Sequence, residues 1–527
     1  MTVAAAVPEN VPGVETNYTK LLLGFLGMAI GQFMAILDIQ IVAASLSQIQ
    51  AGIGASADEI AWVQTTYLLA EVVIMPLTAY MTRLWGTQRT FLTCCALFMI
   101  TSVLAGFSTS IEMMILTRAL QGLAAGAMIP VVFAVAFTAF PVEKRMTANI
   151  FMGLIVTLAP TIGPTLGGHL TDALSWRWLF FVNVFPGVLS LYLVARWGNF
   201  DKGDPSLKRG VDWWGLIAMT IGLVAIQLVL EEGAEHSWFA DDAILWLTVL
   251  GVLTIALFIW RQLTYWQPLL NLKPFADRNF SLGILMTFVS GVSLYGGTFV
   301  LPLYLAQIRQ YSAAEVGTTM LTSGLAMFVM APVTRPLLKY LDYRWAIFGG
   351  FMLCAYAMSL GAHINDQWGF WEFGVLQAIR GVGTIVAMAA SQQVTVSTLR
   401  PDQMKDASAM VNLARNVGGA VGLAAISTIL TVNTRLHLSE LSASLSQANY
   451  GSQQMLAMFT ARMTERGLAN PDGAARKAFQ GLLMKDASVM AFADAFMWLA
   501  IGAAVAACLA LFAKRQGAPS AVAMGAH

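Results

Sequence analysis

Two acidic residues and one arginine lie inside long apolar stretches of the sequence. Asp38 stands in AILDIQIVAA, Glu71 in YLLAEVVIMP and Arg118 in LTRALQGLAAG. A charged side chain inside a membrane span costs about 3 kcal/mol on insertion scales, so such a residue is usually paired and functional. Burial favours the protonated form of a carboxyl group, whereas a nearby arginine favours the ionised form. The three residues therefore predict a proton relay in which a moving arginine makes an acid take up or release a proton.

The composition predicts that these stretches span a membrane. Of 527 residues, 57% are hydrophobic and 11% are charged, whereas soluble domains have roughly 45–50% apolar and about 25% charged residues. The net charge of +1 provides no bulk attraction for nucleic acid, and we expect no such partner. The start of the chain has no basic segment before a short apolar one, which argues against a cleaved signal peptide.

The cysteines indicate neither a disulfide framework nor a metal site. All four lie in apolar runs, where a thiol behaves as a small hydrophobic side chain, and their spacing does not fit zinc. They are Cys94, Cys95, Cys354 and Cys508. We expect no metal and no cofactor.

Fourteen stretches are long and apolar enough to cross a membrane as helices of about 20 residues. The predicted fold class is therefore an all-α polytopic membrane protein. The spans lie near 21–46, 58–82, 90–108, 112–138, 147–171, 178–196, 214–230, 243–263, 280–306, 314–338, 345–362, 371–397, 405–431 and 491–513.

Basic residues in alternate loops predict the orientation, because short cytoplasmic loops collect Lys and Arg. The intervening short loops hold only Arg177 and Arg309 among basic residues, and 231–242 is acidic. Both termini, 1–20 and 514–527, are therefore predicted to be cytoplasmic. The basic set is Lys20, Arg83, Arg89, Lys144, Arg145, Arg196, Lys202, Lys208, Arg209, Arg261, Lys273, Arg278, Lys339, Arg344, Arg400, Lys405, Lys514 and Arg515.

The long loop 432–490 is the exception, since it is mixed in charge and predicted to be external. Long loops cross a membrane largely regardless of charge. Runs such as LHLSELSASLSQ and GSQQMLAMFTARM suggest amphipathic helices. We expect a small, partly helical external cap.

An internal repeat divides the chain. PLTAYMTRLWGTQRTF at Pro76 is echoed by PVTRPLLKYLDYRWAIF at Pro332, and RALQG at Arg118 by QAIRG at Gln377, with Arg and Gln exchanged. Two repeated helical bundles around a central site are a transporter plan. The predicted organisation is six, two and six helices: a first bundle at 21–196, an inserted pair at 197–279 and a second bundle at 280–513.

Helix depth allows Asp38 to reach Arg118. At about 1.5 Å per residue, Asp38 lies about 12 Å and Arg118 about 9 Å from the outer ends of their spans, whereas Glu71 lies about 20 Å from its outer end. Glu71 is deeper and has no evident partner, so it is the favoured proton carrier. The alternative is that Asp38 and Arg118 form a permanent structural pair while Glu71 faces a wet cavity.

Small residues and prolines line one face of the fifth span. Residues four apart share a helix face, small residues allow close helix contact, and proline favours a bend. The pattern fits either an ordinary close contact or a hinge and seal between the two halves. The residues are Pro160, Gly163, Pro164, Gly167 and Gly168.

The second half offers three further buried polar candidates. Asn412 and Arg415 share one face of the thirteenth span, and Arg380 lies in the twelfth. Each arginine is expected either to face the cavity and attract anionic or amphipathic substrates, or to pair at a packed joint. A weaker set of candidates for the cavity lining is Gln32, Phe33, Gln64, Tyr295 and Tyr304.

These stretches resemble the major facilitator superfamily, and within it the fourteen-span drug:proton antiporters of the EmrB/QacA type. LTRALQGLAAGAMIP is similar to the fourth-span motif, with Gln121, Gly122, Gly126 and Pro130 in place. APTIGPTLGGHLTD followed by WRWLFFVNVFPG is similar to the fifth-span signature of exporters. LDIQIVAASL resembles the first-span motif, and ASAMVNLARNVGGAVG the thirteenth span.

The resemblance implies a major facilitator fold and proton-coupled export of amphipathic or hydrophobic toxic compounds by alternating access. It also implies an inner-membrane location and a tripartite system in which loop 432–490 meets a periplasmic adaptor and an outer-membrane channel. In the loop after the second span Gly86 and Arg89 match the family pattern, but Arg83 stands where an acid is common. Gln40, Ala43 and Ser47 also depart from the first-span motif.

Three other functions are open to a polytopic membrane protein. No G-x-x-x-x-G-K-[ST] stretch occurs, which argues against an ATP-driven pump. A membrane subunit of a respiratory enzyme would need mid-membrane lysines, whereas lysines here are confined to loops, so we expect no enzyme. An exporter of a specific metabolite or siderophore, or an importer, remains open because fold does not determine substrate.

Overall fold

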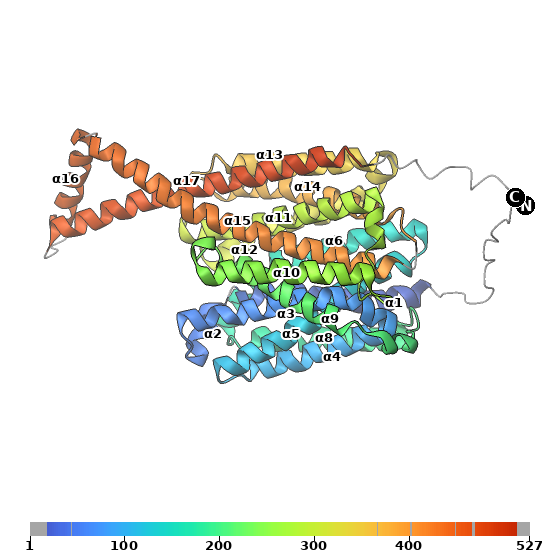
Figure 1. The fold of residues 1–527 in the computed structure, drawn as a ribbon. Helices are drawn as coiled ribbons and strands as arrows, with labels where there is room; N and C mark the ends of the chain where they lie inside the picture. The colour runs from blue at the N-terminus through green and yellow to red at the C-terminus, as the bar shows by residue number, and fades with distance from the viewer. Residues whose placement is uncertain are drawn as a thin grey trace, which may run out of the picture.

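A computed structural model describes residues 18–43, 45–365, 367–400, 403–447, 449–465 and 470–513. Within these residues the secondary structure is helical, without β-strands. The helices form an elongated bundle with their axes roughly parallel, and a helical arm projects from one end (Figure 1). The predicted cytoplasmic tails lie mostly outside the described residues.

Every predicted span coincides with one helix, except the sixth, which is divided into α7 and α8. The helices that occupy the predicted spans are α1 (Tyr18–Ala43), α3 (Ala57–Trp85), α4 (Thr87–Gly106), α5 (Ile111–Thr138), α6 (Val142–Ala173), α7 (Trp178–Phe181), α8 (Val184–Trp197), α9 (Trp213–Glu232), α10 (Asp242–Thr264), α11 (Arg278–Gln307), α12 (Ala313–Tyr340), α13 (Tyr343–Gly361), α14 (Phe370–Val396), α15 (Met404–Gln447) and α17 (Pro471–Ala510). Outside these spans lie α2 (Leu46–Ile53), α16 (Asn449–Glu465) and the 3₁₀ turns η1 (Pro205–Gly210), η2 (Trp238–Ala240) and η3 (Lys273–Ala276).

The lengths and compositions of the helices fit a multi-pass membrane protein. Among the described residues, 12 helices are long and apolar enough to cross a membrane, counting α7 and α8 as one. The remaining two predicted spans are occupied by α6 and α13. The all-α fold class is thus confirmed, and the fourteen predicted spans are compatible with the helices.

Local capping signals set the ends of the repeated helices. Ser56 and Glu59 form a reciprocal capping box at the start of α3, and Ser312 and Glu315 form the same box at the start of α12. Such a box satisfies backbone N–H groups that the first turn leaves unpaired. Both pairs are separated by the same 256 positions as Pro76 and Pro332, so the repeat includes the helix starts.

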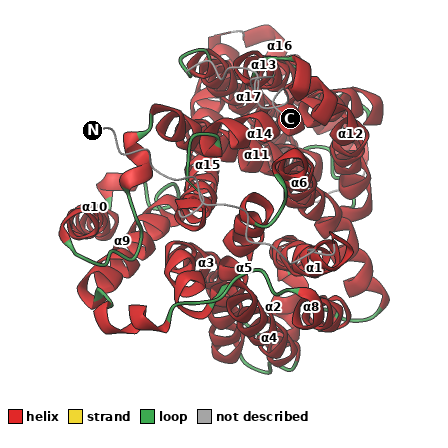
Figure 2. Ribbon diagram, turned by 90° about the vertical axis from the view of Figure 1, so that its right-hand side faces the viewer, coloured by secondary structure: helices red, strands yellow, loops and turns green. Residues whose placement is uncertain are grey.

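The helices gather into two groups with the inserted pair at one side. In Figure 1 the N-terminal helices lie below the C-terminal ones, and Figure 2 shows α9 and α10 at the periphery beside α3. Asp212 and Arg261 join α9 to α10 with an ion pair of 2.7 Å. The division at 21–196, 197–279 and 280–513 stays a prediction that agrees with this grouping.

The inserted pair contacts both groups at the end of the bundle that carries the arm. Thr65 of α3 donates a hydrogen bond of 2.6 Å to Glu231 of α9. Trp238, in the turn between α9 and α10, donates one of 2.9 Å to Thr428 of α15. The pair is therefore attached to a helix of each group and does not stand apart.

The predicted external cap is an arm continuous with two bundle helices. The helix α15 does not end near residue 431 but runs to Gln447, and α17 begins at Pro471 instead of near 491. With α16 they project beyond the bundle (Figure 1). At about 1.5 Å per residue, the 44 residues of α15 extend about 66 Å, about twice the thickness of a bilayer core. The expected helix ends near 431 and 491 are therefore corrected, and the small cap is an extension of α15 and α17 with the helical content that was predicted.

The two groups meet chiefly where α6 contacts α12 and α3 contacts α15, and also where α5 contacts α15 and α6 contacts α14. Near the arm end, a Cβ on Gly317 of α12 would overlap the hydroxyl oxygen of Thr165 in α6. Only a glycine at this position allows the two helices to approach so closely. This contact of α6 with the other group uses Thr165, beside the predicted glycine face.

At the opposite end, ionic contacts connect the groups. We call this end, where Arg83 of α3 and Lys405 of α15 lie, the basic end. Arg83 of α3 forms a 3.2 Å ion pair with Asp406 of α15, and Lys405 pairs with Asp201 in the loop after α8. The acid of this contact, Asp406, therefore comes from the second group, and the base, Arg83, from the first.

Candidate functional site

Asp38 and Arg118 form a buried ion pair between α1 and α5. The Arg118 Nη1 atom lies 2.5 Å from Asp38 Oδ2, and both side chains are fully buried. The same Nη1 donates to Gln121 Oε1 at 2.9 Å, and Gln121 Nε2 donates to Asp38 Oδ1 at 3.1 Å. Asp38, Arg118 and Gln121 thus form a closed triad, the pairing that the depth estimate predicted.

Helix α3 holds the other side of Arg118. Its Nε donates to the Val63 carbonyl oxygen at 3.2 Å, and its guanidinium carbon lies 4.2 Å from the centre of the Tyr67 ring. Tyr67 is itself held by a 3.0 Å hydrogen bond from its hydroxyl to the Ala35 carbonyl. The Nη2 atom of Arg118 has no hydrogen-bond partner. Arg118 therefore keeps one free donor beside Val63 and Tyr67.

Asn183, which is not among the residues predicted from the sequence, completes the shell of Asp38. Asn183 Nδ2 donates to Asp38 Oδ1 at 2.7 Å and lies 3.0 Å from the Ser102 hydroxyl. Asn183 lies in the break between α7 and α8. The available signal was a single amide in the apolar run WLFFVNVF. With the bonds from Arg118 and Gln121, three side chains donate to the two oxygens of Asp38.

The glycines of the LTRALQGLAAG segment bring α3 close to α5. A Cβ on Gly122 would overlap the Tyr67 carbonyl oxygen, and one on Gly126 would lie 2.5 Å from the Glu71 carbonyl oxygen. These contacts place Tyr67 and Glu71 one helical turn apart against the helix that carries Arg118. The motif glycines therefore position the aromatic and acidic residues of α3.

Glu71 contacts the opposite half of the molecule. Its Oε1 accepts a hydrogen bond of 3.2 Å from Asn416 Nδ2 on α15, and its Oε2 has no partner. The residue is 2% exposed. A half-satisfied carboxyl group at a contact between α3 and α15 is sensitive to any relative movement of those helices, since movement removes its one side-chain partner.

The glycine face of α6 lies against α1, inside the first half. A Cβ on Gly163 would overlap Gln40, and one on Gly167 would lie 2.8 Å from the Ile41 carbonyl oxygen. This arrangement corresponds to a close helix contact, and it does not place these glycines in a seal between the halves. Pro164 and Gly168 lie in the same helix, and the side chain of Pro160 lies outside the described residues.

We expect Gly167→Leu to force α6 away from α1. The nearest obstacle is the backbone oxygen of Ile41, which cannot move aside as a side chain can, and overpacking costs typically about 1–3 kcal/mol. The expected result is a lower melting temperature and weaker transport than in the wild type. Gly481→Leu is the control, because nothing lies within 4 Å of its Cβ position. Equal transport and stability in both variants would contradict a tight α1–α6 contact.

Arg380 and Gln377 reproduce the Arg–Gln pair in the second half. Arg380 Nε donates to Gln377 Oε1 at 2.8 Å, and Nη2 lies 3.4 Å from the Ser323 hydroxyl on α12. Gln377 turns its amide to the sulfur of Met320. For Arg380 the described residues provide no ion pair, in contrast to Arg118.

Arg415 is the second buried arginine of this half. Its Nη1 donates to Asn412 Oδ1 at 3.2 Å, its guanidinium carbon lies 5.2 Å from the centre of the Phe133 ring of α5, and Nη2 has no partner. It lines a small cavity with Ser290, Ser293, Leu294, Phe351, Cys354, Thr384, Ala387 and Met388. Arg415 therefore reaches both a cavity and the opposite half.

The weaker lining candidates fall into two groups. Tyr304 is a core residue that is buried between Phe373 and Phe492. Its hydroxyl donates to the Asn365 carbonyl. The prediction that Tyr304 lines the cavity is therefore corrected. Tyr295 is partly exposed against α15, and Phe33 is partly buried against the first core. Buried amide atoms without partners occur at Gln32 and Gln64 and, unforeseen from the sequence, at Asn149 and Gln392.

Other motif residues organise the basic end. Gly86 ends α3 with φ of 84°, a conformation that suits glycine, and the next amide, of Thr87, donates to Asp201 at 2.7 Å. Arg89 is exposed. The Pro130 carbonyl accepts a 2.7 Å hydrogen bond from Ser408 of α15, so this proline of α5 also takes part in a contact between the halves.

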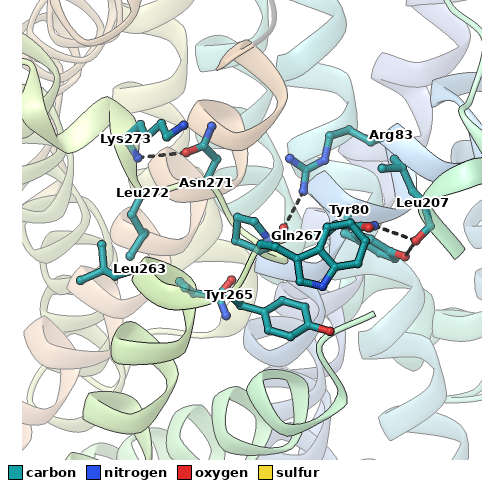
Figure 3. A pocket seen from close by; sticks show the side chains of 12 residues that line it. Tyr80, Arg83, Leu207, Leu263, Tyr265, Gln267, Asn271, Leu272 and Lys273 are labelled. Atoms are coloured by element: carbon teal, nitrogen blue, oxygen red, sulfur yellow. Dashed lines mark hydrogen bonds between the residues drawn. The ribbon is translucent and has the colours of Figure 1, made fainter. Parts of the chain in front are cut away.

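A larger cavity opens where the inserted pair meets the first half (Figure 3). It has a volume of about 480 Å³ and is lined by Tyr80, Arg83, Leu207, Gln262, Leu263, Tyr265, Trp266, Gln267, Pro268, Asn271, Leu272 and Lys273. Arg83 crosses its edge and donates to the Leu269 carbonyl at 2.8 Å. Because Arg83 lies 12 residues, or about 18 Å along α3, from Glu71, this cavity is separate from the buried acids.

Comparison with known sequences identifies relatives along most of the chain. The sequence profile of the Major Facilitator Superfamily matches residues 28–423. The colistin resistance protein EmrB of Acinetobacter baumannii is 35% identical over 93% of this chain and 96% of its own. The multidrug export protein EmrB of Escherichia coli K12 is 28% identical over 83% and 85%. These matches span both repeated halves.

A solved structure shares the arrangement of the helices. The crystal structure of the human organic anion transporter MFSD10 covers 92% of this chain and 99% of its own, with a TM-score of 0.53 and 12% identity. At this identity the likeness concerns the fold alone.

Proposed function

The chain belongs to the major facilitator superfamily, within its EmrB type, and on that premise we propose that it is a proton-coupled multidrug efflux transporter. It exports amphipathic or hydrophobic toxic compounds across the inner membrane by alternating access. The names of the relatives, colistin resistance protein and multidrug export protein, support export. It acts as a transporter rather than an enzyme.

One observation carries the proton coupling: Glu71 is buried and has its single side-chain partner, Asn416, in the opposite half. Alternating access moves one half against the other. When the contact opens, the carboxyl group loses a donor that favours its ionised form. Substrate movement and proton uptake are thereby linked at one residue, while Asp38 holds Arg118 beside Tyr67 on the same face of α3.

Inverted membrane vesicles test this function. The vesicles are loaded with a proton gradient and a pH-sensitive dye, and a panel of candidate substrates is added. We expect substrates to release protons from the vesicles only when the protein is present. A response restricted to one metabolite or siderophore would favour a specific exporter, and substrate uptake without proton movement would refute antiport.

In this proposal the basic end faces the cytoplasm and the arm faces the periplasm. The loops and chain ends predicted on this side carry 18 of the 30 lysines and arginines, as the positive-inside rule requires. Both termini are then cytoplasmic. Cysteine accessibility at Ser439, on the arm, and at Lys202, at the basic end, is the corresponding measurement.

The arm is the proposed docking surface for a periplasmic adaptor that leads to an outer-membrane channel. It projects well beyond the bundle, and its exposed apolar side chains include Met455, Met458 and Met484. Methionine surfaces adapt to partners. Such a surface is available without disturbing the buried acids.

Deleting residues 440–485 should abolish adaptor binding and leave the bundle inserted in the membrane. The deletion removes the distal part of α15, all of α16 and the beginning of α17. We expect loss of adaptor co-purification together with retained proton-coupled substrate uptake in inverted vesicles. Replacement of Arg89, an exposed residue at the other end, by Ala is the matched control. Unaltered adaptor binding after the deletion would refute docking on the arm.

A further inference from the structure

The cavity between the inserted pair and the first half lies apart from the buried acids (Figure 3). Its volume of about 480 Å³ falls within the roughly 300–1,000 Å³ of ligand-binding pockets. Among the described residues that line it, Arg83 and Lys273 are basic and none is acidic. The cavity therefore has the size and the charge to hold an anionic group.

Two hydrogen-bond donors of the lining have no partner in the described part of the chain. Gln262 of α10 is 4% exposed, and its Nε2 atom donates to no acceptor, whereas its Oε1 accepts from the Leu270 amide at 3.1 Å. The Nε atom of Arg83 is also buried without a partner. Buried donors without an acceptor cost free energy, and a phosphate group offers several acceptor oxygens. These donors therefore suit a phosphate better than an apolar ligand.

The segments around the cavity carry a surplus of positive charge. The residues 201–212 and 261–278, which supply the lining besides α3, include six basic and four acidic residues. One of these acids, Asp212, is already held by Arg261 in an ion pair of 2.7 Å. The remaining positive charge attracts anions to this end of the molecule.

Exposed tryptophans place the cavity at the level of the bilayer surface. Trp213, Trp214, Trp260 and Trp266 lie at the basic end of the inserted pair and are 58% to 71% exposed. Tryptophan side chains gather at the boundary between lipid and water. Trp266 also lines the cavity. The cavity therefore lies at the depth of the lipid head groups.

An apolar stripe of α10 continues from the cavity along the bundle. Leu263 lines the cavity and is 70% exposed. Ile259 and Val252, four and eleven residues earlier, lie on the same helix face and are 45% and 58% exposed. Acyl chains along this stripe would place their head group at the cavity. The arrangement thus suits a phospholipid, which has both parts, better than a free phosphate ion.

We propose that the cavity binds the phosphate of an anionic phospholipid from the bilayer leaflet at the basic end. Arg83, Gln262 and Lys273 supply the donors, and the acyl chains lie along the apolar stripe of α10. Basic pockets between membrane helices on the cytoplasmic side bind anionic head groups. The proposed orientation determines which leaflet supplies the lipid, but binding itself does not depend on export.

Arg83 connects this site to the contact between the two halves. Its Nη1 atom donates to Asp406 at 3.2 Å, and its Nη2 atom donates to the Leu269 carbonyl at 2.8 Å. Asp406 also accepts from the amide of Asn271, another lining residue, at 3.3 Å. A phosphate in the cavity and Asp406 therefore compete for one guanidinium group, so bound lipid weakens the ionic contact at the basic end.

Titration calorimetry on the full-length protein in detergent micelles tests the site with three probes. Dioctanoyl phosphatidylglycerol is anionic, dioctanoyl phosphatidylcholine has the same chains without net charge, and inorganic phosphate has no chains. We expect the phosphatidylglycerol to bind about ten-fold more tightly than the phosphatidylcholine, as charge-assisted hydrogen bonds allow. Inorganic phosphate should bind more weakly than the phosphatidylglycerol, because it cannot use the apolar stripe.

Two variants examine the assigned residues. Lys273→Gln should remove most of the preference for phosphatidylglycerol, whereas Lys339→Gln should keep it. Lys339 is the matched control, because it is an exposed lysine at the basic end of α12 and does not line the cavity. Asp406→Asn removes the charge that competes for Arg83, so phosphatidylglycerol should bind more tightly. Thermal unfolding of each variant establishes that it is folded.

Equal affinity for the two lipids, or equal loss of phosphatidylglycerol binding in Lys273→Gln and Lys339→Gln, would overturn the site. Inorganic phosphate that binds as tightly as phosphatidylglycerol would identify a site for free anions and overturn the lipid assignment. Unchanged or weaker lipid binding in Asp406→Asn would contradict the competition for Arg83. Absence of proton-coupled export would refute the efflux function and leave the lipid site standing, so the two proposals fail separately.

Discussion

Glu71→Gln should abolish proton-driven export, lowering resistance to that of cells without the transporter. Glutamine has nearly the same shape and its oxygen still accepts the hydrogen bond from Asn416, but it cannot release a proton. The variant therefore imitates the protonated acid at the contact between α3 and α15. The measurements are drug resistance in cells and substrate-induced proton release from inverted vesicles.

Two controls separate coupling from folding. Substrate exchange across vesicles without a gradient needs no net proton transfer, so it should persist in Glu71→Gln. Asn416→Ala keeps the acid but removes its donor, and we expect export to continue with an altered pH dependence. Full resistance in cells that express Glu71→Gln would exclude Glu71 as the proton carrier.

The second large effect is expected on stability. Asp38→Asn or Arg118→Gln alone leaves one charge of the buried pair without a partner, and breaking such a pair costs about 3–5 kcal/mol. The double variant removes both charges and retains amide groups that can bond with Gln121 and Asn183. We expect it to be more stable than either single variant, as measured by unfolding of the purified protein in mixed micelles.

The same double variant distinguishes the two interpretations of the pair. If Arg118 takes part in coupling, the double variant should be stable yet unable to move protons with substrate. Retained coupling in the stable double variant would identify the pair as purely structural. Additive losses of stability from the two single changes would contradict a direct interaction.

Side-chain contacts within one half could be predicted from the sequence where they depend on helix length and depth. Apolar helices of membrane-spanning length set the depth of each residue, so Asp38 and Arg118 could be matched from their distances to the helix ends. The repeat also identified Arg380 and Gln377 as the counterparts of Gln121 and Arg118. Asn183 escaped notice, because no rule of spacing brings the break between α7 and α8 to Asp38.

Contacts between the halves were beyond the reach of these rules. Glu71 and Asn416 are 345 positions apart, and their contact depends on how two helix groups pack, which periodicity does not encode. The ion pair of Arg83 with Asp406 also depends on how the two groups pack. Arg83 departs from the family pattern, and in the structure it contacts an acid from the other half. The arm was foreseen as helical, but not as an extension of α15 and α17.

The sequence by itself determined the spans, the predicted orientation, the repeat and the family. Inside a bilayer each helix must form its own backbone hydrogen bonds, so each span can be recognised from its own residues. Only the tertiary structure decided which helix faces each buried side chain. It turned Gly163 and Gly167 toward α1, moved Tyr304 into the core and set Gly297 beside Arg380. Helix depth follows from the chain, whereas the direction of a side chain around its helix follows from packing against distant partners.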